Sequence, residues 1–579
     1  MKKTGLSGLI LLMLITNGIA KASSPAVPLI LEAESAATYG VSLSNQGMKF
    51  SGTGFLTGFD AGDSIVFTFQ AKKLQYELSF AVATTGAEYP VVTINNGKSR
   101  TLSIKTASDT FIMVTVGKVV LDEGSNTVVF KMRTSNTGSL KLDYLKATPI
   151  IIAPPLGSSK QLSDTQATAV TKNLYSYLMD LYGKKVLSGQ HELSDINYIR
   201  SKTTKFPAIG SFDLIEYSPS RRAYGSNPGR YTENAIQWAT DNNTIIAMMW
   251  HWNAPTDLIN TTGKEWWRGF YTYATTFDIE AVLNDTSSER YQLVLRDIDS
   301  IASQLKKIQA AGLPVLWRPL HEAAGGWFWW GAKGPEPLKK LWRLLYQRLT
   351  NYHQIHNLIW VFTLERVDTT WYPGDDYVDI VSLDLYPSST TPPPTLATDW
   401  EAIKKIFNGR KPITLSEAGV LFNPDNARIY GTWWSGFTVW TGDFIRKVPL
   451  DELKYTYWDE DVLTADELPD WKNYKEGDSL YKQGDPLPNQ IQSSQQAQST
   501  ISVYPNPAKD VIHISFNNPT TQPLTLDLYN STGMLIKKIA IANYTTNISI
   551  DLKNQKKGLY FLKLNNGNMT TQCYKLIKQ

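Results

Sequence analysis

Short apolar runs alternate with helical stretches through the middle of the chain, and this alternation constrains the fold more than any other feature. Val170, Leu174, Leu178 and Leu181 recur at helical spacing before the first run. Eight strand-like runs follow, with helical segments such as Leu338–Tyr352 between them: Val186–Ser188, Ala208–Phe212, Thr244–Trp250, Pro314–Leu320, Leu358–Thr363, Val378–Leu385, Ile413–Leu415 and Gly436–Trp440. This pattern predicts a (β/α)8 TIM barrel over residues 161–490. An open doubly wound sheet is the alternative, but no Gly-rich phosphate loop follows any of the runs.

The segment before the barrel, residues 29–148, is predicted to be a β-sandwich. Its strand-like segments are short and rich in β-branched and aromatic residues, and turn sequences such as Asn95-Asn96-Gly97 separate them. The predicted strands are Ser64–Phe69, Tyr76–Ala83, Val91–Ile94, Phe111–Val116, Thr127–Met132 and Leu140–Leu145. Regular spacing of this kind is typical of a sandwich.

The C-terminal segment, residues 501–579, alternates in the same way and is predicted to be a small all-β domain. The polar, low-complexity stretch Ser493–Ser499 before it is predicted to be a linker. The segment contains nine Lys and three Asp but no Arg or Glu. That charge either solubilises strand edges or serves docking to a surface.

The N-terminus predicts a signal peptide over residues 1–22. Lys2 and Lys3 precede a short apolar stretch, and Ala20-Lys21-Ala22 supplies a small-x-small cleavage site. The stretch is too short for a transmembrane anchor. With one cysteine in 579 residues the chain forms no internal disulfide, and a net charge of +4 gives no chain-wide field for nucleic acid.

Two glutamates at predicted strand ends carry the strongest signal for chemistry. Glu322 follows the fourth strand and precedes the aromatic run Trp327–Trp330, while Glu417 ends the seventh. Active-site groups of barrels lie at the C-terminal ends of strands, and glycosidic hydrolysis uses two carboxyl groups that flank the bond. All 18 tryptophans fall between Trp238 and Trp471, and planar aromatic rings suit the apolar faces of sugars.

Arg318 and His251 are further candidates for the site. Arg318 is four residues before Glu322, so along a strand both side chains would face the same way, and a buried arginine would keep a carboxylate ionised. A purely structural ion pair inside the barrel is compatible with that role. His251 is flanked by Trp250 and Trp252 at the third strand end. Zinc is disfavoured because neither HxxEH nor HExxH spacing occurs.

These residues stand in motifs that resemble glycoside hydrolase family 26, whose members are mostly β-1,4-mannanases. The matching segments span nearly the whole predicted barrel: LSGQHE, MMWHWN, WRPLHEAAGGWFWWG, LDLYP, LSEAG, WWSGFTVWTGDFI and VLTADELP. The resemblance implies that Glu322 is the acid/base and Glu417 the nucleophile of a retaining reaction that needs no cofactor. It also implies a sugar site lined by His251, His321, Trp327, Tyr386 and Trp440.

The N-terminal module resembles the related family 6 and family 35 carbohydrate-binding modules, through LEAESA, GDSIVFTF, EGSNTVVF and LKLDYLKA. That resemblance implies a structural Ca²⁺ with the ligands Glu32, Glu34 and Asp143, and hard oxygen ligands suit calcium. The module contains no tryptophan, so either Tyr or Phe grips the sugar, or binding is weak, or the module is only structural.

Residues 501–579 resemble the sorting domain of the type IX secretion system, through the opening Val503–Pro507 and the closing Lys575–Lys578. The resemblance implies export to the outer surface or medium by the secretion machinery and removal of this domain. The alternative is another adhesive β-module.

Together these features predict a secreted β-mannanase that acts on mannan, glucomannan or galactomannan. Within the same fold the alternatives are release of mannobiose from chain ends and hydrolysis of β-1,3-xylan or mixed-linkage β-glucan. From a different class, the alternative is a non-catalytic protein that binds polysaccharide, which the presence of both glutamates disfavours.

Overall fold

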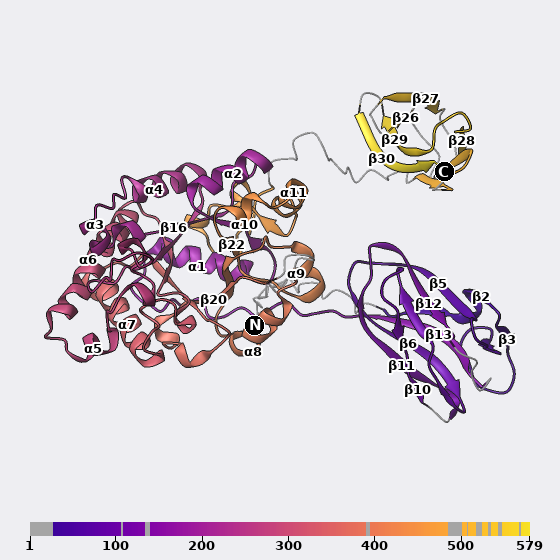
Figure 1. Cartoon of the computed structure of the whole chain (residues 1–579), viewed down its shortest axis with the longest axis horizontal. Coiled ribbons are helices and arrows are strands. Elements are labelled where there is room, and N and C mark those ends of the chain that lie inside the picture. Colours follow the sequence, from indigo (N-terminus) through magenta and orange to yellow (C-terminus); the bar gives the residue numbers. More distant parts are fainter. Residues whose placement is uncertain are drawn as a thin grey trace, which may run out of the picture. The chain divides into compact units, whose positions relative to one another are not determined.

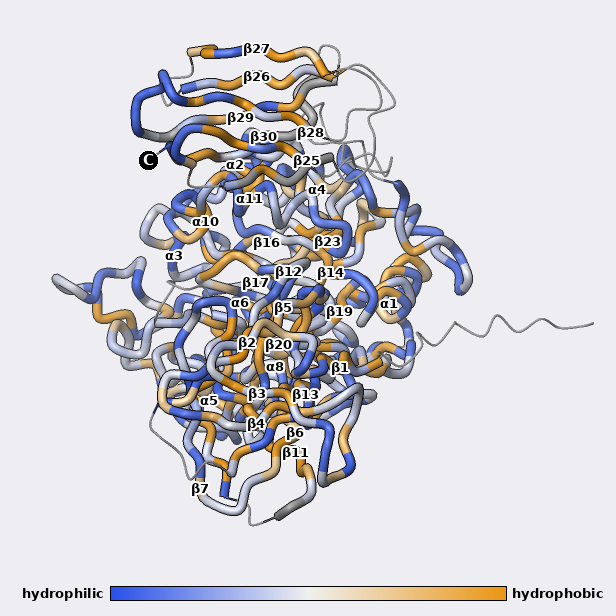
Figure 2. Tube along the Cα trace, turned by 90° about the vertical axis from the view of Figure 1, so that its right-hand side faces the viewer, coloured by the Kyte–Doolittle hydropathy of each residue, from blue (hydrophilic) through white to orange (hydrophobic). Residues whose placement is uncertain are grey.

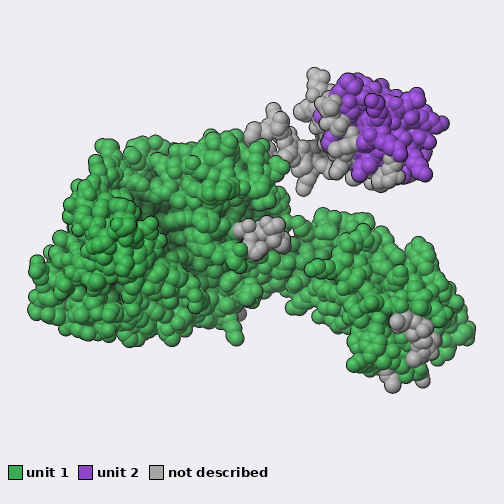
Figure 3. Space-filling view, viewed as in Figure 1, with its two compact units in different colours: residues 1–485 green, residues 486–579 purple. Residues whose placement is uncertain are grey.

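The computed structural model describes residues 27–105, 108–133, 139–388, 394–483, 501–505, 508–516, 524–530, 534–541, 547–566 and 569–578. The predicted signal peptide, residues 1–22, and the predicted linker Ser493–Ser499 lie outside these ranges. The chain divides into two compact units, Met1–Asp485 and Pro486–Gln579, which Figure 3 colours separately.

The first module of the first unit is a two-sheet β-structure. One sheet has the strand order β11-β6-β13-β4-β3, with β1 paired to β13, and the other has the order β2-β5-β12-β8-β9. The bounds are β1 Leu29–Glu32, β2 Ala37–Tyr39, β3 Ser42–Ser44, β4 Phe55–Thr57, β5 Ser64–Ala71, β6 Gln75–Thr84, β7 Ala87–Glu88, β8 Val91–Ile94, β9 Arg100–Thr101, β10 Ile104–Lys105, β11 Ser108–Val120, β12 Gly124–Lys131 and β13 Lys141–Pro149. All six strands predicted for this module are present.

Alternating burial explains why these segments form a sandwich. On β5 the side chains of Ile65, Phe67 and Phe69 are buried. The rings of Phe80 and Phe130, on β6 and β12, meet edge-to-face in the core with centroids 5.0 Å apart. The module buries its apolar face between the two sheets, as the period-2 pattern predicts.

The second module is a closed barrel of eight parallel strands, β15 to β22 in sequence order (Figure 1). This confirms the predicted (β/α)8 fold. The bounds are β15 Gly189–His191, β16 Ile209–Asp213, β17 Ile245–Trp250, β18 Val315–Pro319, β19 Leu358–Thr363, β20 Ile380–Leu385, β21 Ile413–Ala418 and β22 Phe437–Val439. The central strands are almost wholly buried, so they read as continuous apolar runs in the sequence.

Helices connect and cover these strands. The first, α1 (Ala169–Leu181), buries Leu174, Leu178 and Leu181, and the side chain of Thr168 accepts a hydrogen bond from the backbone N–H of Thr171 to cap it. The other helices are α2 Leu193–Thr203, α3 Pro219–Ala223, α4 Tyr231–Asn242, α5 Ile279–Asn284, α6 Glu289–Ala310, α7 Pro335–Gln347, α8 Ala397–Phe407, α9 Pro424–Tyr430, α10 Asp443–Arg446 and α11 Leu450–Tyr457.

The prediction for the first barrel strand was wrong by three residues: the predicted run is Val186–Ser188, and the strand is β15. The apolar pair Val186–Leu187 forms β14, which pairs with β23 (Val462–Leu463) outside the barrel. The barrel strand is the next segment, Gly189–His191, which contains no aliphatic residue. A Cβ on Gly189 would lie 2.4 Å from the carbonyl oxygen of Phe437, so glycine permits the close approach of the neighbouring strand.

The second unit is all-β, as predicted. It contains a three-stranded sheet, β24-β25-β28, and a four-stranded sheet, β27-β26-β29-β30. The bounds are β24 Ile501–Tyr504, β25 Val511–Phe516, β26 Leu524–Asn530, β27 Leu535–Ile541, β28 Asn547–Asp551, β29 Gly558–Asn566 and β30 Met569–Lys578. Apolar stretches mark β26 and β27 in orange in Figure 2. Across the described ranges of the whole chain, no helix has both the length and the apolar character needed to cross a membrane.

Candidate active site

Glu322 lies in a tight turn just beyond the end of β18. Its backbone φ is +54° and that of Leu320 is +51°, a left-handed conformation that non-glycine residues seldom adopt. The turn is fixed from behind, because the buried indole of Trp330 donates a hydrogen bond to the carbonyl oxygen of His321 at 2.9 Å. Backbone strain of this kind persists where the surrounding structure enforces it, and it marks functional positions.

The aromatic run after Glu322 divides into two roles. Trp329 and Trp330 are fully buried, and the indole of Trp329 donates to the carbonyl oxygen of Trp252 at 2.5 Å. Trp327 is 37% exposed and is therefore the member of the run that is available to a ligand. Trp327 is also the one member of the run that the family resemblance implies for the sugar site.

Glu417 lies within β21, where the pairing with β20 is irregular. Leu383 pairs with Leu415, but the next pair is Asp384 with Glu417, so Ser416 is an extra residue on β21. Such a β-bulge redirects the side chains that follow it and is common beside active sites. The bulge brings the carboxyl group of Glu417 opposite that of Asp384.

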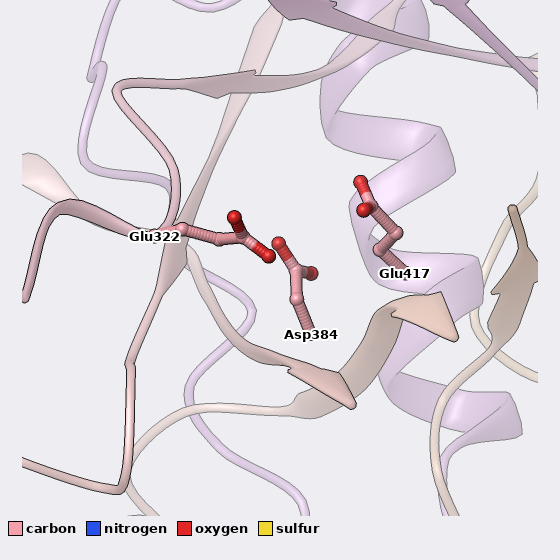
Figure 4. Close-up of side chains that lie close together, drawn as sticks. All are labelled: Glu322, Asp384 and Glu417. Carbon is pink, nitrogen blue, oxygen red and sulfur yellow. The ribbon is translucent and has the colours of Figure 1, made fainter. Parts of the chain in front are cut away.

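The three carboxyl groups converge at the C-terminal end of the barrel (Figure 4). One oxygen each of Glu322, Asp384 and Glu417 lies within 4.8 Å of the others. Glycoside hydrolases that retain anomeric configuration place their two carboxyl groups about 5–5.5 Å apart, whereas inverting enzymes need about 6.5–9.5 Å. The spacing therefore favours direct attack by a carboxylate over attack by an interposed water.

Arg318 is buried between two of these groups. Its guanidinium donates to Asp384 and to Glu417, at 2.6 Å in each case. The hydroxyl of Tyr386 donates to the other oxygen of Glu417 at 2.5 Å. The predicted pairing of Arg318 with one of the two candidate carboxylates, Glu417, is present. Strand alternation does not extend to Glu322, because β18 ends at Pro319.

Glu322 has the character of an acid. Burial raises its pKa to about 7, and the negative charge of Glu417 acts in the same direction. The indole of Trp327 donates a hydrogen bond to Glu322 at 2.9 Å and partly opposes the shift, because it favours the ionised form. A carboxyl group with this pKa is substantially protonated near neutrality and can donate its proton to a leaving oxygen.

Replacing Trp327 with phenylalanine removes that indole donor while keeping an aromatic ring. The pKa of Glu322 is expected to rise further, so the alkaline limb of the kcat profile should move to higher pH. A hydrogen bond to a charged group contributes about 1.5–3 kcal/mol, which corresponds to a shift of about one to two pH units. Rates measured across pH check this, and a shift to lower pH would contradict it.

The predicted histidines lie beside the carboxyl groups. The Nε2 atoms of His251 and His321 are 3.1 Å apart. The ring of Trp440 follows β22 and meets His191 edge-on, with centroids 4.9 Å apart, and it also contacts the ring of His251. All eight barrel residues predicted for the site thus lie within one connected network at the strand ends.

Sequence reasoning missed several polar residues of this network. Asp384 stands in the LDLYP segment at the end of β20, and Asp213 ends β16. Glu192 follows β15, and burial raises its pKa to about 7 although it accepts a hydrogen bond from Tyr231. Their position at strand ends is the signal that could have found them.

Among the described residues, the three carboxyl groups of the barrel are the only acidic cluster compact enough to hold a metal ion. Arg318 lies between Asp384 and Glu417 and supplies the positive charge that a cation would otherwise provide. This geometry supports a hydrolytic pair rather than a metal centre.

The carboxyl groups of Glu32, Glu34 and Asp143 surround a loop in the sandwich. Ser51 donates to Glu32 at 2.8 Å, and Thr53 donates to Glu34 at 2.6 Å. The Oε2 atoms of both glutamates are buried and accept no hydrogen bond from the described residues. Burial, with the charges of Glu32 and Glu34, raises the pKa of Asp143 to about 6. These oxygens fit a hard cation, although they are less tightly gathered than the barrel cluster.

Two family models match the chain. The model described as glycosyl hydrolase family 26 matches residues 163–467. The model described as a secretion system C-terminal sorting domain matches residues 502–579. The second match confirms the sorting domain predicted from the sequence.

Similar proteins cover the sandwich and the barrel together. A mannan endo-1,4-beta-mannosidase of Thermothelomyces thermophilus is 42% identical over 76% of this chain and 91% of its own length. Mannan endo-1,4-beta-mannosidase A of a Piromyces species is 31% identical over 76% of this chain and 72% of its own. The crystal structure of a Podospora anserina GH26-CBM35 beta-(1,4)-mannanase is 40% identical, with a TM-score of 0.70, over 77% of this chain and 99% of that one.

Proposed function

Because the chain belongs to glycosyl hydrolase family 26, we propose that it hydrolyses β-1,4-mannosidic bonds in mannan, glucomannan or galactomannan with retention of configuration. The relatives that it matches over most of their length are named mannan endo-1,4-beta-mannosidases. The single observation that supports retention is the 4.8 Å limit on the oxygens of Glu322 and Glu417.

In the first step Glu417 attacks the anomeric carbon while Glu322 protonates the departing oxygen. Arg318 and Tyr386 support this role of Glu417, because their hydrogen bonds hold its carboxylate in one orientation. The raised pKa of Glu322 supports its role as the acid.

In the second step Glu322, now ionised, removes a proton from water, and that water releases the covalent mannosyl intermediate from Glu417. No cofactor takes part in either step. His251, His321, Trp327, Tyr386 and Trp440 line the sugar site beside the bond that is cleaved, with Arg318 beneath it.

The test is proton NMR of the anomeric region while the purified chain digests mannohexaose. Early β-anomer products would support a retaining β-mannanase, and the product lengths would separate internal cleavage from mannobiose release at chain ends. Initial α-anomer would overturn the roles of Glu322 and Glu417. If mannan is not cleaved, β-1,3-xylan and mixed-linkage β-glucan are the next substrates, and binding without any cleavage would indicate a polysaccharide-binding protein.

The remaining segments complete the proposal. Residues 1–22 act as a signal peptide, residues 29–148 as a carbohydrate-binding module and residues 161–490 as the catalytic domain. Residues 501–579 are the sorting domain, which directs type IX secretion to the extracellular space or the cell surface. The partners are therefore the mannan substrate and the secretion machinery, and processing removes the sorting domain.

A structural calcium ion held by Glu32, Glu34 and Asp143 is part of this proposal. The expected result is that calcium added to the EDTA-treated full chain raises the melting temperature of the sandwich, because a cation neutralises three clustered carboxylates. Calorimetry measures the shift. Glu32→Gln should remove it, whereas Glu77→Gln, at an exposed position on β6, should not. An equal shift in all three proteins would contradict the site.

A further inference from the structure

His251 is held in an apolar enclosure at the end of β17. The rings of Phe270 and Phe328 pack edge-on against its imidazole, with centroids 5.1 Å and 5.4 Å away. The ring of His321 stands perpendicular to it at 87°. An imidazole in such surroundings is strongly dependent on its few polar partners.

Asp213, on the neighbouring strand β16, contacts both the imidazole and the backbone of His251. Its Oδ2 lies 2.6 Å from Nδ1 of His251, and its Oδ1 accepts the backbone N–H of the same residue at 3.0 Å. Oδ1 also accepts the backbone N–H of Ile215 at 2.9 Å. Two backbone N–H groups thus hold the carboxylate of Asp213 in place beside the imidazole.

We propose that Asp213 is a positioning residue of the active site: it holds the imidazole of His251 in one orientation, and as the imidazolium ion, beside Glu417. This inference rests on the proposed function, since it assigns a task to Asp213 in the same reaction. Asp213 would act through His251 and would touch neither the sugar nor the reacting atoms.

The hydrogen bond between the two histidines needs one donor and one acceptor. Asp213 accepts from Nδ1 of His251, so Nε2 is the nitrogen that His251 presents to His321. Burial would lower the pKa of His251, but Asp213 outweighs it and the pKa is raised; for His321, burial and the charge of Arg318 lower the pKa. The proposal accordingly places the proton between the rings on His251, with His321 as its acceptor.

The titratable and charged groups around His251 come from four strands of the barrel or the turns that follow them. Asp213 and Glu417 favour its charged form, whereas Arg318 opposes it, and the neutral rings of His321 and His191 complete the set. With His251 charged, two cations act on Glu417: Arg318 through a hydrogen bond and His251 through its charge. Two cations stabilise the carboxylate that must be ionised to attack the sugar.

The direct test is NMR of the full chain with isotope-labelled histidine. The chain has six histidines, and a His251→Gln variant assigns the signal. We expect both ring nitrogens of His251 to carry protons at neutral pH and His321 to carry one. A neutral His251 in the folded wild-type protein would overturn the proposal without any variant at Asp213.

The second test is Asp213→Asn, which keeps the size of the side chain and removes its charge. We expect kcat to fall about 10- to 100-fold, as when a partner that orients a functional histidine is lost. The acid limb of the kcat/KM profile should also shift, because one of the charges that act on the site is lost.

The matched control is Asp164→Asn, at another buried aspartate that contacts a histidine. Its Oδ2 lies 2.8 Å from Nδ1 of His356, which precedes β19 at the opposite end of the barrel. This variant should leave the pH profile unchanged. If Asp213→Asn loses activity without any shift of the acid limb, its role is structural only. Failure of the proposed function would appear differently, as absence of hydrolysis by the wild-type chain.

Discussion

Glu417→Ala is expected to lower kcat on mannan by about four orders of magnitude while the protein remains folded. In the proposed mechanism this carboxylate forms the covalent bond to the sugar, and no neighbouring group can replace it: Asp384 is already hydrogen-bonded to Arg318 and Ser416. The fold should persist because Arg318 keeps its ion pair with Asp384. Initial rates and thermal unfolding of the purified variant check both statements. Glu336→Ala, at an exposed glutamate on α7, serves as the control and should keep the wild-type rate.

Chemical rescue makes this result specific to a nucleophile. Azide can occupy the space left by the removed carboxylate and attack an activated aryl mannobioside from the same face. The product should be the α-mannosyl azide, because a single displacement inverts the β-linkage. Rescue that gives the β-azide would assign the nucleophile to another residue, and a near-normal rate without azide would remove Glu417 from the mechanism.

Glu322→Ala is expected to lower kcat on mannan by about 10²- to 10⁴-fold, the range that a general acid–base group contributes. The loss should be much smaller in the first step with a dinitrophenyl leaving group, which departs without protonation. The alkaline limb set by the Glu322 pKa of about 7 should disappear from the pH profile. Burst kinetics on the activated substrate separate the two steps.

Azide gives the complementary outcome for this variant. The covalent intermediate on Glu417 still forms, and azide then attacks it from the face where Glu322 normally activates water. The product should be the β-mannosyl azide, because two inversions restore the starting configuration. If Glu322→Ala and Glu417→Ala gave the same azide anomer, the two roles could not be divided as proposed.

The barrel was predictable from the sequence because buried parallel strands form continuous apolar runs. Seven of the eight predicted runs coincide with barrel strands to within a few residues. The first was displaced because its strand, Gly189–His191, has no aliphatic residue, while the apolar pair Val186–Leu187 beside it is buried elsewhere. Apolar patterning indicates that a segment is buried, but it does not show which sheet the segment joins.

The site was predictable where a residue type was unusual for its position. Glu322 and Glu417 stood out as acids at the ends of apolar runs, but the turn and the bulge that aim them depend on long-range pairing. Asp384 and Asp213 were missed because a single aspartate after a strand is ordinary in a sequence. Only the folded barrel brings Asp384 to Arg318 and Asp213 to His251.

The extra residue Ser416 has a consequence for how the chain can vary. Side chains alternate along a strand, so regular pairing of Ser416 with Asp384 would turn Glu417 toward the opposite face of the sheet. The bulge instead keeps both Ser416 and Glu417 beside Asp384. The orientation of the Glu417 carboxyl group therefore depends on the bulge in β21 as well as on the identity of the residue. A descendant gene could exchange many side chains around the cleft and keep its reaction, but a change that lets β21 pair regularly while retaining Ser416 would turn Glu417 away from the site.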